Sequence, residues 1–167
     1  QWVREGKLTT EKISLHQQIY TNKMVIQGHE GNIKKLHSDV DRLEKVRAIA
    51  RQTAAREAAE SALVLASEAQ APLDEAGAQR ALGQIALAAG ELEEAVVALE
   101  ASRILLSDQG NRYELAQTLT GLAEAFLAQD RLQEARDLLV EAVEVFTELD
   151  ASRDLARAAG LLESVDA

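Results

Sequence analysis

Hydrophobic and small side chains recur at a fixed interval of forty residues along most of this chain. Leu82, Leu122 and Leu162 keep this spacing. The same offset relates Ala76/Ala116/Ala156, Leu92/Leu132, Glu94/Glu134, Ala95/Ala135 and Leu99/Leu139. A fixed period between about 20 and 50 residues indicates supersecondary units that stack on one another. Because stacked units form extended surfaces and rarely enclose active sites, the pattern predicts a binding module.

Within each repeat the apolar residues follow helical spacing, as Leu115, Leu119, Leu122 and Phe126 do. Turn residues separate these stripes at Gln70 to Leu73 (around Pro72), Gly90, Asp108 to Asn111, Gln129 with Asp130, and Asp150. The pattern predicts an all-α fold, an α-solenoid of antiparallel helix pairs. Its helices are expected over residues 51–69, 74–89, 91–107, 113–128, 131–149 and 152–164.

The N-terminal part shows a different period. Residues 12–50 read as one long helix with a heptad repeat. The β-branched residues Ile19, Ile26, Ile33 and Val40 take its a positions, and Leu15, Asn22, His29, Leu36, Leu43 and Ala50 take its d positions. β-Branched a residues with leucine at d favour a parallel two-stranded coiled coil. The association residues are therefore expected to be Ile19, Ile26, Ile33, Leu36, Val40 and Leu43.

Two alternatives stay open for this segment. Gly28 and Gly31 each weaken a helix by roughly 1 kcal/mol relative to alanine, so they also fit two helices over 10–27 and 32–50. The apolar stripe fits packing on the first repeat of the same chain as well as pairing with a second copy.

Charge changes sharply near residue 50. Residues 1–50 hold nine basic and six acidic side chains, whereas residues 51–167 hold nine basic and twenty-two acidic ones. The chain is therefore expected to consist of an N-terminal helical segment, 1–50, and a repeat domain, 51–167. The acidic repeat domain lacks the clustered lysine and arginine that phosphate recognition needs, so no nucleic-acid partner is expected.

The composition excludes several kinds of functional site. The sequence contains no cysteine, which excludes disulfides and thiolate metal sites. The histidines at 16, 29 and 37 are too far apart for a helical metal pair, and we expect no metal, no cofactor and no enzyme activity. No apolar run reaches the length of a membrane span. We expect a cytoplasmic location, and because the chain begins at Gln1 rather than Met, we expect it to be part of a longer protein.

The repeats resemble the tetratricopeptide repeat, whose signature places aromatic residues at positions 4 and 11, Leu-Gly at 7 and 8, alanine at 20 and 27, and an aromatic or large apolar residue at 24. Leu82-Gly83, Ala95 and Leu99 fit positions 7, 8, 20 and 24 in the first full unit, whereas Ala86 stands at 11 and Ser102 at 27. Leu122-Ala123, Phe126, Ala135, Leu139 and Ala142 fit the signature in the second. The aromatic residue at position 4 is missing, and the period is forty rather than thirty-four. Such extended repeats resemble those of bacterial signalling and regulatory proteins.

The resemblance implies a groove lined by the first helix of each pair. Its positions correspond to Arg80, Gln84, Leu87, Gln117, Thr120, Glu124, Leu127 and Arg157, which would suit a short polar peptide. Arg80 and Arg157 are suited to carboxylates, but each also fits a solvated residue in a weak ion pair.

We therefore expect a non-catalytic scaffold that binds a protein or peptide partner within a larger bacterial regulatory protein. Two alternatives remain: a structural element that forms a homodimer through the N-terminal helix, and the sensory arm of a signalling enzyme whose catalytic domain lies outside this sequence.

Overall fold

The computed structural model describes residues 2–166, with side chains placed at 14, 15 and 17–165. Six helices account for the secondary structure of this part: α1 (Trp2–Glu68), α2 (Pro72–Ala89), α3 (Leu92–Ser107), α4 (Arg112–Ala128), α5 (Leu132–Glu148) and α6 (Ser152–Asp166). Internal contacts divide the chain into two compact units, Gln1–Ala50 and Arg51–Ala167. Each unit is described by itself.

The N-terminal unit is a single helical segment. α1 passes through Gly28 and Gly31 without a break, so the two-helix alternative for this segment is wrong. Every described side chain between residues 14 and 50 is exposed. The six residues of the heptad stripe are each between 51% and 67% exposed: Ile19, Ile26, Ile33, Leu36, Val40 and Leu43. The segment therefore presents a continuous apolar stripe.

α1 also differs from the sequence prediction at residue 50. The helices expected over 12–50 and 51–69 are one helix, because residues 48–62 are rich in alanine and contain no glycine or proline. The change in charge at this point is therefore not a change in secondary structure.

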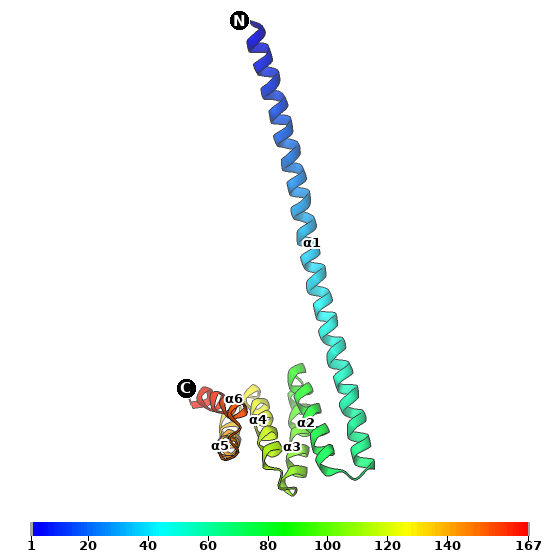
Figure 1. Ribbon diagram of the computed structural model, residues 1–167, viewed down its shortest axis with the longest axis vertical. Coiled ribbons are helices and arrows are strands. Elements are labelled where there is room, and N and C mark those ends of the chain that lie inside the picture. The colour runs from blue at the N-terminus through cyan, green and yellow to red at the C-terminus, as the bar shows by residue number, and fades with distance from the viewer. Residues whose placement is uncertain (1, 167) are drawn as a thin grey trace. The chain divides into compact units, whose positions relative to one another are not determined.

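The repeat unit consists of paired helices (Figure 1). α2 packs against α3, and α4 packs against α5, as antiparallel helix pairs; α6 follows as the first helix of a further pair. Neighbouring pairs contact each other through α3 with α4 and α5 with α6. The first helices of the pairs, α2, α4 and α6, also contact one another in sequence. This arrangement confirms the predicted all-α helical repeat.

Helix starts follow local chemistry. α2 begins at Pro72, two residues before the predicted start, because proline suits the first helical position, where no backbone donor is needed. α4 begins after Asn111, whose Oδ1 accepts a hydrogen bond from the backbone N–H of Glu114 at 3.3 Å. This is the N-cap that a free backbone donor at a helix start requires.

The core is built from small residues where helices cross and leucines between the pairs. Ala95 and Ala135 are fully buried at equivalent positions of α3 and α5, as are Leu99 and Leu139. Phe146 is 1% exposed and adds the largest side chain. Small residues let helix backbones approach closely, so leucines from the neighbouring helix fill the remaining space.

The turns reveal a shorter period inside the repeat. Residues with positive φ occur every twenty positions, at Gln70, Gly90, Gly110, Asp130 and Asp150. After four of them, the next backbone N–H donates to a carbonyl five residues back at 2.9 Å, as Glu91 does to Ala86. This is the Schellman closure of a helix C-terminus. Each forty-residue repeat therefore consists of two twenty-residue halves, and each half ends at a residue with positive φ.

Candidate functional site

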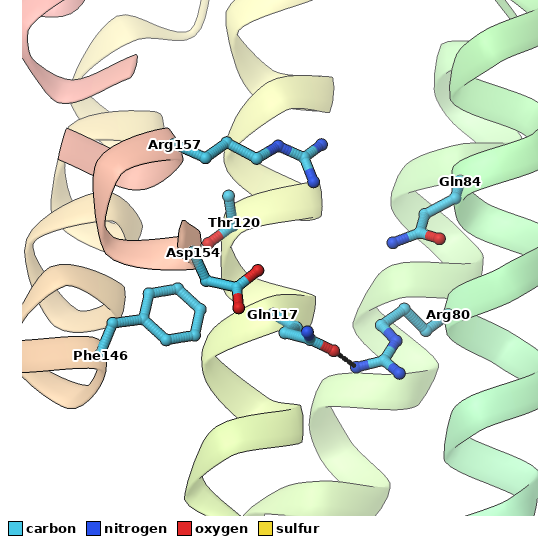
Figure 2. Close-up of a pocket in the computed structure, with 7 residues that line it drawn as sticks. All are labelled: Arg80, Gln84, Gln117, Thr120, Phe146, Asp154 and Arg157. Atoms are coloured by element: carbon cyan, nitrogen blue, oxygen red, sulfur yellow. Dashed lines mark hydrogen bonds between the residues drawn. The ribbon is translucent and has the colours of Figure 1, made fainter. Parts of the chain in front are cut away.

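A pocket of about 250 Å³ lies along the first helices α2, α4 and α6 (Figure 2). Its lining comes from all three of these helices and from α5: Arg80, Gln84, Gln117, Thr120, Phe146, Asp154 and Arg157. Most of these groups are polar. The pocket is therefore a place where three successive repeats present hydrogen-bonding groups to the same volume.

Arg80 connects α2 to α4. Its Nη1 donates to Gln117 Oε1 at 2.6 Å and to the backbone carbonyl of Glu114 at 3.4 Å. The same nitrogen forms an ion pair with the Glu114 carboxylate. The Arg80 side chain is only 18% exposed, so this ion pair is partly shielded from water. Figure 2 shows Arg80 reaching across to the amide of Gln117.

A hydrogen bond continues from Gln117 to α6. Gln117 Nε2 donates to the Tyr113 hydroxyl at 2.8 Å, and that hydroxyl donates to Asp154 Oδ2, also at 2.8 Å. The hydrogen bond to Asp154 is the main cause that raises the pKa of Tyr113 above its ordinary value. Arg80, Gln117, Tyr113 and Asp154 thus form one cross-repeat hydrogen-bond chain, with a cation at one end and a carboxylate at the other.

Arg157 forms a second link between α6 and α4. Its Nε donates to Glu124 Oε1 at 3.0 Å, and its Nη2 donates to both carboxylate oxygens at 2.7 and 2.8 Å. This geometry is the bidentate fork that guanidinium and carboxylate groups favour. The Arg157 side chain is 56% exposed, so the pair contributes at most about 1 kcal/mol to stability.

Comparison with known proteins assigns this part of the chain to a family. Residues 74–148, which span α2 to α5, match the family described as tetratricopeptide repeat. These residues are tetratricopeptide repeats. A comparison with curated proteins gives no match.

The structure brings together five of the eight residues predicted to line the groove of the tetratricopeptide repeats. Arg80, Gln84, Gln117, Thr120 and Arg157 all line the pocket. Glu124 lies beside it and holds Arg157. The other two residues, Leu87 and Leu127, are partly buried against the hydrophobic core. Their apolar side chains gain more from packing against the core than from exposure to the polar pocket.

Sequence reasoning missed three members of the site. Asp154 lies in the lining, Tyr113 joins Asp154 to Gln117, and the buried Phe146 of α5 borders the pocket. The rings of Tyr113 and Phe146 meet edge to face, with centroids 6.0 Å apart. A signal for Asp154 was present in the sequence, because Asp74, Glu114 and Asp154 place an acid every forty residues.

The site has the chemistry of a binding surface. Its cations are matched by carboxylates, and its glutamine and tyrosine side chains donate and accept hydrogen bonds. Among the described residues, no group of three or more His, Asp or Glu side chains could hold a metal ion. Across residues 2–166, no helix combines the length and apolarity that crossing a bilayer requires.

Proposed function

We propose that the tetratricopeptide repeats form a non-catalytic module that binds a partner peptide in the pocket along α2, α4 and α6. The observation that carries this proposal is the cross-repeat hydrogen-bond chain. It holds Gln117 and Asp154 in fixed orientations and leaves the exposed Gln84 facing the same pocket. A surface whose polar groups are already oriented loses little side-chain entropy when a ligand binds.

The pairing of the two arginines indicates the chemistry of the peptide. Arg80 and Arg157 already contact Glu114 and Glu124, so a strongly acidic ligand would have to displace these carboxylates. A polar peptide in an extended conformation can instead bind through its backbone N–H and C=O groups and its side-chain amides. Gln84, Gln117 and Asp154 supply the matching donors and acceptors.

A displayed library of random peptides, selected against the full chain, tests the proposal. We expect selected peptides to bind the unmodified chain and to lose at least about tenfold in affinity with the Gln84→Ala variant, the loss of one hydrogen bond in a desolvated pocket. Gln133→Ala, which changes another exposed helical glutamine, on α5, is the matched control. Equal affinity for both variants would place the peptide elsewhere and contradict the proposal.

The setting of the module is a further part of the proposal. The forty-residue repeats resemble those of bacterial regulatory and signalling proteins, and we infer a cytoplasmic regulator as their context. In such a protein the repeats supply recognition, and a neighbouring domain supplies the response. The full coding sequence tests this inference: an effector domain next to residues 1–167 would support it, and a secreted or purely structural context would contradict it.

A second candidate function is supported by the N-terminal unit. Its exposed apolar stripe, from Ile19 to Leu43, supports a role as an association element that forms a homodimer. The two functions are compatible because they use different residues. Molar mass in solution, measured by light scattering, tests the second one directly.

A further inference from the structure

We propose that residues 15–50 of α1 pair with a second copy of this chain in the antiparallel orientation, about a two-fold axis between Lys34 and Lys35. The inference rests on the proposed association function and adds the orientation and register of the pair. It replaces the parallel arrangement that the β-branched a positions alone would favour.

The first step is the surface itself. Along about 35 residues, or roughly 50 Å of helix, the a and d positions expose large apolar side chains such as Ile26, Ile33, Leu36 and Leu43. A soluble monomer rarely exposes an apolar patch of this extent. A second copy of the same helix carries the same heptad spacing and can therefore cover the stripe along its whole length.

The second step is the arrangement of the apolar layers. In an antiparallel pair, each a residue packs against a d residue of the other copy, and two-fold symmetry makes every contact occur twice. With the axis between Lys34 and Lys35, Ile33 meets Leu36 of the second copy, and Ile26 meets Leu43. Between these two layers, Val40 meets His29. Further out, Arg47 meets Asn22 and Ile19 meets Ala50. The three layers nearest the axis on each side thus contain at least one large apolar side chain.

The third step, which decides the orientation, is the charge beside the stripe. In this register the flanking e positions place Lys23 next to Glu44 of the second copy, and Glu30 next to His37. The flanking g positions place Val25 next to Val46 and Asn32 next to Asp39. Lys23 with Glu44 pairs opposite charges, and Val25 with Val46 pairs apolar side chains. In the other two contacts a carboxylate meets the imidazole of His37 or the amide of Asn32, so no like charges meet. Charges at e and g set the orientation of helix pairing.

In a parallel pair, by contrast, like charges would lie next to each other beside the apolar stripe. There, Asp39 at a g position would lie next to Glu44 of the second copy, and Val25 would lie next to Glu30. Arg47 and His29 would each face their own copies within the seam. Like charges at such close positions oppose association. The side chains flanking the stripe therefore favour the antiparallel pair.

Cysteine cross-linking tests the orientation cleanly, because the chain contains no native cysteine. Two single variants of the full chain are prepared, Ile26→Cys and Leu43→Cys, and are oxidised separately and as a mixture. We expect a disulfide-linked dimer in the mixture and little in either variant alone. Efficient cross-linking of each variant with itself would show a parallel pair and overturn the proposal.

Charge reversal gives an independent readout in uncross-linked protein. At low salt, Lys23→Glu and Glu44→Lys should each weaken dimerisation by roughly five- to tenfold, because each places two like-charge contacts in the dimer. The double variant should restore the affinity. In a parallel pair, Glu44→Lys would instead strengthen association, because residue 44 would face Asp39.

Light scattering on the unmodified chain distinguishes a failure of dimerisation from a failure of the antiparallel orientation. A monomer at all accessible concentrations would overturn both the association function and its orientation. A dimer that cross-links in the parallel pattern would overturn the orientation alone. Neither outcome touches peptide binding by the repeats, which is tested with different residues.

Discussion

Gly83 of α2 lies against Leu99 of α3 with no room for a side chain. A Cβ at Gly83 would come within 2.5 Å of Leu99 Cγ and within 3.0 Å of Leu99 Cδ2. Leu99 is itself fully buried and touches the surface of α4 as well, since a Cβ at Gly121 would lie 3.3 Å from its Cδ2. The absence of one methyl group thus fixes how α2, α3 and α4 pack.

We therefore expect Gly83→Ala to destabilise the protein by about 1–3 kcal/mol, since Leu99 would be forced from its position in a closed core. Gly77→Ala on the same helix is the control. Apart from the adjoining backbone of α2 itself and its chain neighbours, no atom lies within 4 Å of the Cβ position there, so the higher helix propensity of alanine should raise stability by up to about 1 kcal/mol. Chemical denaturation measures both changes. Equal effects of the two substitutions would show that the close contact is not limiting.

A buried hydroxyl pair joins α3 to α4. Ser102 Oγ lies 3.2 Å from Thr118 Oγ1, which also donates to the Glu114 carbonyl at 3.0 Å. Thr118→Val leaves the Ser102 hydroxyl buried without this partner and should cost about 1–3 kcal/mol. Adding Ser102→Ala should recover part of the loss, because an apolar pair needs no hydrogen bond.

The next repeat supports the expectation that an apolar pair is tolerated at this helix crossing. The positions equivalent to Ser102 and Thr118 in the next helix crossing are Ala142 and Ala158, both fully buried. A double-mutant cycle, read from denaturation curves of the single and double variants, measures the coupling. Strictly additive losses would contradict the account of the pair.

The titration of Tyr113 tests the cross-repeat hydrogen-bond chain. The Asp154 carboxylate raises the pKa of Tyr113 because it stabilises the protonated hydroxyl, and partial burial and the charge of Glu114 act in the same direction. The raised pKa means that this hydrogen bond stabilises the fold fully below about pH 10 and that its contribution is lost as pH rises through the folded-state pKa.

The chain has two tyrosines, so a Tyr20→Phe background isolates Tyr113. Phenolate absorbance should then titrate above the ordinary tyrosine range, and Asp154→Asn should lower the midpoint. Asp74→Asn, the equivalent acid of α2, should leave the midpoint in place. A midpoint that ignores Asp154→Asn would show that Tyr113 does not donate to this carboxylate in solution.

The sequence predicted the helices of the repeat unit well because their signals are local. Apolar stripes, Gly90 and the alanine-rich segments each specify a helix or its end within a few residues. The differences between the predicted and the observed helix ends also have local causes. Pro72 was read as part of a break, although it is the first residue of α2. Turns were predicted at Gln70, Asp130 and Asp150, but their left-handed conformation was not, because glycine marks only two of the five positive-φ positions.

The pocket was harder to predict because its decisive contacts cross repeats. Tyr113 and Asp154 are 41 residues apart in sequence, and Arg80 and Gln117 are 37 apart. Repeat register identified Arg80, Gln84 and Gln117 as residues on the first helices. It gave no information on which side chains bond to each other, since this depends on how adjacent pairs stack. Asp154 and Phe146 enter the site only through that stacking.

The most direct test of the central claim, that the repeats bind a peptide in the pocket along α2, α4 and α6, is photo-cross-linking of a selected peptide. A photoreactive amino acid is introduced at Gln84 of the full chain and, in a second protein, at Gln133. We predict that the peptide is captured from position 84 and not from position 133. Because Asp154 and Arg157 line the same pocket as Gln84, the captured peptide should lie near both of them. Capture from position 133, or none from position 84, would contradict the proposed function.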